Sequence, residues 1–126
     1  MASVSPSKEN PLGFERQEMN GVHVMRFHAA KILSEQTVNE FGTRLLDAIQ
    51  EVPDPPKLVV SFTGVYFLSS AGVGKLVLIQ RKVKERGGEL KLCDLSPTTL
   101  EVFKVARLQD YFSIYPDVNS ALAGMP

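Results

Sequence analysis

Two adjacent serines stand between a buried strand and an amphipathic helix that the sequence predicts, in the segment of residues 64–75 (GVYFLSSAGVGK). The Ser70 hydroxyl is placed to cap that helix, and the free N–H groups and positive dipole end of a helix also favour a phosphate there. Two interpretations of Ser70 follow: a capping serine without modification, or a phosphoacceptor. Gly72 and Gly74 carry no side chain, so another backbone can approach this turn closely.

Other chemistries fit this segment poorly. The run at residues 72–75 (GVGK) ends like a Walker A loop, but Ser69 and Leu76 stand where that loop requires glycine and then Ser or Thr. A hydrolase nucleophile at Ser70 would need glycine two residues away on both sides, and Leu68 fills one of these positions. No cluster of Asp, Glu, His or Cys has metal-ligand spacing. We therefore expect no catalysis, no metal ion and no cofactor, with an enzyme that uses Ser70 as nucleophile as the third alternative.

The composition restricts the compartment and the partners. A chain of 126 residues with 44% hydrophobic content has room for one buried core. Its 14 basic and 14 acidic residues balance, so no overall field attracts nucleic acid or a membrane surface. No apolar run resembles a signal peptide or spans a bilayer, and the lone Cys93 is compatible with a reducing compartment. We expect a cytoplasmic protein that contacts neither nucleic acid nor membrane, with a flexible segment at residues 1–11 and one domain at residues 12–126.

Strands and helices alternate along the predicted domain. Asn20-Gly21 favours a type I′ turn in a hairpin of about residues 13–27. Apolar residues at helical spacing follow Ser34, Ser70 and Ser96. The remaining segments are strands at residues 58–62, 89–92 and 112–115, and a short terminal helix that Asp117 caps.

This order requires parallel crossover connections, which place the helices against a sheet. The predicted fold is therefore α/β, with a mixed sheet of four to five strands, an N-terminal β-hairpin and three to four helices. Each strand ends where the next helix begins. The capping candidates Ser34, Ser70 and Ser96 should therefore gather along one edge of the sheet, where α/β folds usually bind their partners.

These motifs resemble the STAS domains of bacterial anti-sigma factor antagonists. In that family F-[MLI]-D-S-[ST]-G-[LV]-G opens the second helix, and residues 67–74 (FLSSAGVG) are similar to it. Residues 87–90 (GGEL) match the end of the same helix, and Ser96-Pro97 matches the start of the third. The resemblance spans about residues 13–122 and implies the STAS fold.

The resemblance also implies a role for the serines. Ser70 aligns with the family's phosphoacceptor, and Ala71 removes a second acceptor. Ser69 replaces the acidic residue before the acceptor, and Ser34 replaces the acidic residue at the start of the first helix. The implied partner surface comprises the loop at residues 29–34 and the start of the second helix, with these residues: Ser34, Ser69, Ser70, Ala71, Gly72, Gly74 and Lys75.

The function that the resemblance implies is partner switching. The unmodified antagonist binds an anti-sigma factor, which is also an ATP-dependent serine kinase, and so releases a sigma factor. Phosphorylation of Ser70 separates the complex, and a PP2C-type phosphatase restores the active form. ATP belongs to the kinase in this cycle. The two lost acidic residues favour an alternative, a STAS module that binds without phosphorylation in a sensory assembly or a lipid-transport complex.

Overall fold

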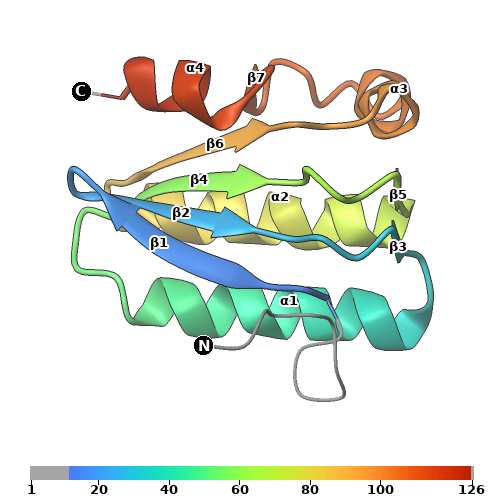
Figure 1. Ribbon diagram of the computed structural model, residues 1–126, viewed down its shortest axis with the longest axis horizontal. Helices are drawn as coiled ribbons and strands as arrows, with labels where there is room; N and C mark the ends of the chain where they lie inside the picture. The colour runs from blue at the N-terminus through green and yellow to red at the C-terminus, as the bar shows by residue number, and fades with distance from the viewer. Residues whose placement is uncertain (1–11, 126) are drawn as a thin grey trace, which may run out of the picture.

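The computed structural model describes residues 12–125, and the segment predicted to be flexible, residues 1–11, lies outside them. Figure 1 shows the chain in order. Its described elements are β1 (Glu15–Met19), β2 (Val22–Arg26), β3 (Lys31–Ile32), α1 (Glu35–Gln50), β4 (Lys57–Ser61), β5 (Phe67–Leu68), α2 (Ser70–Glu85), β6 (Glu89–Cys93), α3 (Pro97–Val105), β7 (Ser113–Tyr115) and α4 (Val118–Ala123).

A mixed sheet of five strands, in the order β1-β2-β4-β6-β7, forms the centre of the fold. The β1–β2 hairpin is antiparallel, and the other neighbouring strands are parallel. At the hairpin turn Asn20 and Gly21 both have positive φ, 55° and 82°, as a type I′ turn requires. The predicted α/β architecture and the predicted hairpin are both confirmed.

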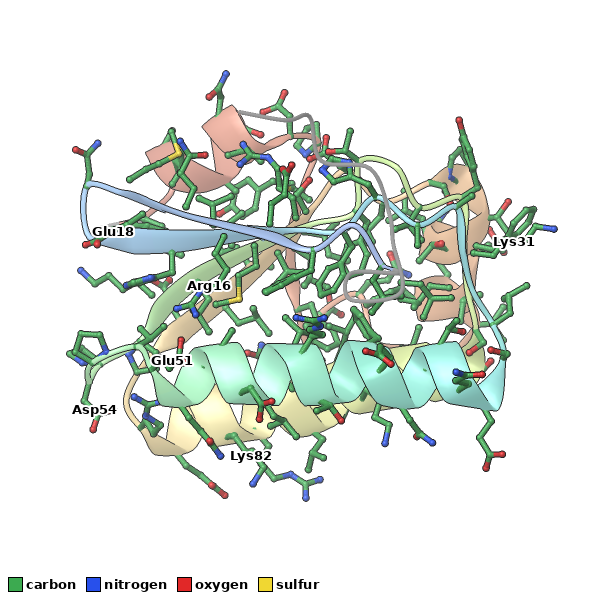
Figure 2. The ribbon with its side chains drawn as sticks, turned by 60° about the horizontal axis from the view of Figure 1, so that its bottom comes forward. Arg16, Glu18, Lys31, Glu51, Asp54 and Lys82 are labelled. Carbon is green, nitrogen blue, oxygen red and sulfur yellow. The ribbon has the colours of Figure 1, made fainter. Side chains whose placement is uncertain are left out.

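Helices α1 and α2 cover one face of the sheet, and α4 lies on the other (Figures 1 and 2). The two-sided cover explains why three consecutive residues of β4, Leu58, Val59 and Val60, are apolar. Leu58 and Val60 belong to the core that includes α1 and α2, whereas Val59 packs with Ala121 of α4. The three strand residues are fully buried.

Two short strands form a second, separate sheet that the sequence analysis did not predict. Strands β3 and β5 pair in parallel, with Lys31 opposite Phe67 and Ile32 opposite Leu68. Strands of two residues are too short for a periodic pattern of apolar side chains, so their pairing depends on the tertiary fold. This small sheet leads directly into the starts of α1 and α2.

Candidate functional site

The starts of α1, α2 and α3 gather at one end of the molecule, at the right of Figure 1 beside β3 and β5. The Ser69 amide donates to the Ile32 carbonyl at 3.0 Å, which joins the start of α2 to the strand before Ser34. The Ser96 hydroxyl donates to the Tyr66 carbonyl at 2.8 Å and so brings in the start of α3. The prediction that the three serine-led helix starts share one edge is confirmed.

Helix α2 is capped by Ser69 and not by Ser70. The Ser69 hydroxyl accepts a hydrogen bond from the Gly72 amide at 3.2 Å, and its backbone is extended, with φ −71° and ψ 165°. Ser70 is already the first helical residue. The prediction that Ser70 caps the helix is therefore wrong: β5 ends at Leu68, its extended backbone continues through one more residue, and that residue becomes the cap.

The other two predicted serine caps are confirmed. Ser34 accepts from the Thr37 amide at 3.1 Å, and Ser96 accepts from the Thr99 amide at 3.2 Å, followed by Pro97 in the first turn of α3. Each cap satisfies one of the backbone N–H groups that a helix start leaves open. A short side-chain oxygen is enough for this task, so the serines at positions 34 and 69 keep the capping function without a negative charge.

The Ser70 side chain is exposed, and its hydroxyl has no hydrogen-bond partner among residues 12–125. The first turn of α2 contains no acidic residue. A phosphate on Ser70 would therefore be the first negative charge at the positive end of this helix, where an anion is favoured. Modification at this atom would break no internal hydrogen bond with the described residues.

Exposed apolar side chains lie around the helix starts. Leu33, Tyr66 and Phe67 expose 49%, 65% and 42% of their surface, and all three come from β5 or from the residues that flank β3 and β5. We call these three residues the apolar rim. All three stand within a few residues of the start of α1 or α2. In the sequence Leu33 stands directly before the cap Ser34, and Phe67 and Tyr66 stand two and three residues before the cap Ser69.

The remaining predicted partner residues lie on different sides of α2. Ala71 and Gly74 are exposed, whereas Gly72 is buried. Leu68 packs so closely on Gly72 that an added Cβ would lie 2.4 Å from Leu68 Cδ1. Lys75 is five residues beyond Ser70, a rotation of about 140° around the helix axis. Its stem lies over Gly42 of α1, where an added Cβ would be 3.0 Å from Lys75 Cδ. The fold therefore separates Lys75 from the side of α2 that carries Ser70.

The described residues also bear on other chemistries. No group of three or more His, Cys, Asp or Glu side chains between residues 12 and 125 could hold a metal ion. Burial, together with a hydrogen bond to Asp94, raises the pKa of the Cys93 thiol to about 12, so this thiol stays protonated near neutral pH. Within the part of the chain that the structure describes, no helix has the length and apolar character needed to cross a membrane.

A family model described as STAS domain matches residues 14–121. This chain belongs to the STAS domain family. The match includes every serine of the helix starts and the apolar rim.

Two known relatives carry names that refer to anti-sigma factors. The protein BtrV of Bordetella bronchiseptica, which is named as an anti-sigma factor antagonist, is 33% identical over 64 residues. That match covers 51% of this chain and 53% of BtrV, so it spans about half the length of the relative. The anti-sigma F factor antagonist of Paenibacillus polymyxa is 24% identical over 111 residues, which are 88% of this chain and 92% of the relative.

Solved STAS structures share the fold of this chain. An anti-sigma-factor antagonist (STAS) domain protein of Planctomyces limnophilus superposes with a TM-score of 0.77 at 25% identity, over 87% of this chain and 95% of that one. The phosphorylated form of SpoIIAA, a Bacillus cell fate determinant, superposes with a TM-score of 0.63 at 21% identity, over 87% and 96% of the two chains. SpoIIAA is also known in its unphosphorylated form, with a TM-score of 0.69 at 20% identity, over 90% of this chain and 98% of that one.

Proposed function

We propose that this chain is an anti-sigma factor antagonist that binds an anti-sigma factor with serine kinase activity and is switched off by phosphorylation of Ser70. The observation that carries the proposal is that only one of two neighbouring serines is used as the helix cap. Ser69 caps α2, which leaves the Ser70 hydroxyl exposed and free of hydrogen bonds to the described residues. A serine that the fold does not use is available to a kinase.

The relatives support the same reading. BtrV and the Paenibacillus polymyxa protein are both named as anti-sigma factor antagonists, and SpoIIAA exists in phosphorylated and unphosphorylated forms. In the family pattern Ser70 stands at the phosphoacceptor position. A PP2C-type phosphatase would restore the unmodified chain, and ATP would be bound by the kinase.

The switch acts on binding and leaves the fold intact. A phosphate at a helix start is favoured by about 0.3–1 kcal/mol, so the modified chain stays folded. In a complex the same group would be buried against a surface that fits a neutral hydroxyl, and an unpaired buried charge costs about 3–5 kcal/mol. At about 1.4 kcal/mol for each tenfold change in affinity, binding weakens about a hundredfold or more.

Calorimetric titration of a candidate anti-sigma factor kinase tests the proposal. We expect Ser70→Asp to bind about a hundredfold more weakly than the wild type while melting at nearly the same temperature. Ser70→Ala should bind well and accept no phosphate from ATP. Ser113→Asp is the matched control, because Ser113 is an exposed serine in the edge strand β7. Equal affinities for the Ser70→Asp and Ser113→Asp variants, or phosphate still incorporated into Ser70→Ala, would contradict the proposal.

The same assay separates the second candidate, a STAS module that binds without phosphorylation. Uncharged serines at positions 34 and 69, where the family pattern has acids, favour it. If this second function is the correct one, mass spectrometry will find no phosphate on the Ser70 peptide after incubation with the kinase and ATP, although the complex forms.

A further inference from the structure

Strand β1 forms one edge of the five-stranded sheet, and its outer side has no partner strand among residues 12–125. In the described part of the chain β1 pairs with β2 alone. The residues from Glu15 to Glu18 are all exposed. The strand at the opposite edge, β7, has only 3 residues, whereas β1 has 5. An exposed strand edge presents a row of N–H and C=O groups to which another chain can add a strand.

The hairpin decides which backbone groups of β1 point outward. A two-residue turn closes it, so Met19 and Val22 form the first hydrogen-bonded pair beside the turn. Hydrogen-bonded and non-hydrogen-bonded pairs then alternate along the two strands, so Gln17 bonds to β2 and its neighbours in the chain do not. The N–H and C=O groups of Arg16 and Glu18 therefore point away from β2, and they have no partner among the described residues.

The charges on β1 favour one way of pairing two copies of this strand. Two antiparallel copies can exchange backbone hydrogen bonds about a two-fold axis only where their outward-pointing residues meet. With the axis at Gln17, Arg16 of each copy lies directly opposite Glu18 of the other. An axis moved by one residue places Arg16 opposite Arg16, or Glu18 opposite Glu18. Because unlike charges directly opposite each other stabilise a strand pair and like charges destabilise it, the axis at Gln17 is favoured.

The side chains of Arg16 and Glu18 are placed for such pairs. Arg16 lies opposite Met25, whose side chain belongs to the core that includes α1 and α2, so Arg16 and Glu18 are on this side of the sheet. Arg16 donates to Glu51 at the end of α1 (Figure 2), and a guanidinium has further N–H donors for a second carboxylate. Glu18 has no ion pair or hydrogen bond through its side chain with a described residue. An open cavity of about 370 Å³ beside Arg16 and Glu51 leaves room between α1 and this edge.

We propose that this chain forms a two-fold dimer through β1, in which the sheets of two copies join into one continuous sheet. Arg16 and Glu18 of one copy exchange backbone hydrogen bonds and ion pairs with Glu18 and Arg16 of the second copy. A charged edge discourages pairing with most other strands, so the same charges make the contact specific for a second copy. The inference does not depend on the function proposed for Ser70, because the helix starts lie beside β3 and β5 (Figure 1).

Exchanging the two charges is the direct test. Sedimentation equilibrium of the full chain, from low micromolar to millimolar concentration, should show a dimer of the 13.9 kDa chain that weakens as salt is added. Arg16→Glu and Glu18→Arg each place like charges opposite each other on both sides of the axis, so each should weaken dimerisation about tenfold or more. The double variant Arg16→Glu/Glu18→Arg restores unlike pairs and should recover most of the affinity.

Glu15→Arg is the matched control for Glu18→Arg. Glu15 is another exposed carboxylate of β1, but with the axis at Gln17 it lies opposite the uncharged Met19 of the second copy. The same change in charge at this position should leave the dimerisation constant unchanged.

A proline variant tests the backbone part of the contact. Glu18→Pro removes an N–H group that points outward, and proline is tolerated at such positions of edge strands. Glu18→Ala removes the same charge and keeps the N–H group. We expect both variants to stay folded in thermal melts, and Glu18→Pro to dimerise about tenfold more weakly than Glu18→Ala, since a hydrogen bond is lost on each side of the axis.

The outcomes separate this inference from the proposed function. A wild-type chain that stays monomeric over the whole concentration range would overturn the dimer and leave the switch at Ser70 standing. A dimer that the single charge variants do not weaken, or that the double variant does not recover, would be formed by another surface, and the proposal would again be wrong. Ser70→Asp should dimerise like the wild type, and a loss of the dimer in this variant would place the contact at the helix starts and not at β1.

Discussion

Helix α2 meets α1 on one side and α3 on the other, and the two sides are built differently. Toward α1 the Lys75 stem lies over Gly42, and the cavity between the helices is only about 160 Å³. Toward α3 the groove beside Gly74 is about 490 Å³. Both sides contain a glycine on one of the two helices, but a neighbouring side chain covers only Gly42. The comparison indicates that α2 is packed closely against α1 on one side and is left open toward α3 on the other.

Truncating one apolar side chain on each side of α2 should give the largest difference in the free energy of unfolding. Ile79→Ala on the closed side removes a side chain that is 1% exposed, and we expect a loss of about 2–5 kcal/mol in the free energy of unfolding. Val105→Ala on the open side should change it by less than about 0.5 kcal/mol, because Val105 is 77% exposed. Urea denaturation of both variants measures the difference. Equal losses would mean that the groove is packed in solution.

Adding a methyl group should change the stability of the fold in opposite directions at the two glycines near the start of α2. Gly72→Ala forces the buried Leu68 side chain to move, since the new Cβ would lie 2.4 Å from its Cδ1, and should cost about 1–3 kcal/mol. Gly74→Ala meets no atom and removes a poor helix former, so it should stabilise by about 0.4–1 kcal/mol. Thermal melts of the pair test this. A destabilised Gly74→Ala variant would show that the groove wall is already in contact with another part of the chain.

The smallest expected difference in stability is between alanine variants of the two adjacent serines, Ser69 and Ser70. Ser69→Ala removes the hydrogen bond to the Gly72 amide and should cost about 1 kcal/mol. Ser70→Ala removes no hydrogen bond with the described residues and should change stability by less than about 0.5 kcal/mol. Denaturant midpoints of the two variants decide which serine is the cap. A larger loss for Ser70→Ala would reverse the assignment and weaken the case for a free phosphoacceptor.

Much of the fold is visible in local patterns of the sequence. Asn20-Gly21 predicts the hairpin because these residues accept positive φ, and Ser34 and Ser96 predict helix starts because a side-chain oxygen can reach the open amides. The continuous apolar run around β4 predicts a strand covered on both faces. These signals are local, since each depends on the conformation of a few neighbouring residues.

The candidate site was predicted in part. Its segment and the gathering of the helix starts were found from the sequence, but the choice between Ser69 and Ser70 as cap was not. Both serines have the right chemistry, and only the point at which β5 ends decides between them. Lys75 was placed with Ser70 because the two are close along the chain, whereas the rotation of the helix turns it toward α1.

The sequence by itself determined the order of the elements, the turn chemistry and the presence of an exposed helix start with two serines, because backbone sterics and capping act over a few residues. The tertiary structure alone decided the β3–β5 pairing, the free hydroxyl of Ser70 and the groove beside Gly74. Those features depend on how far apart separate elements are held. Phe103 and the bond from Ser96 to Tyr66 fix α3 at its distance from α2, and no local pattern encodes that distance.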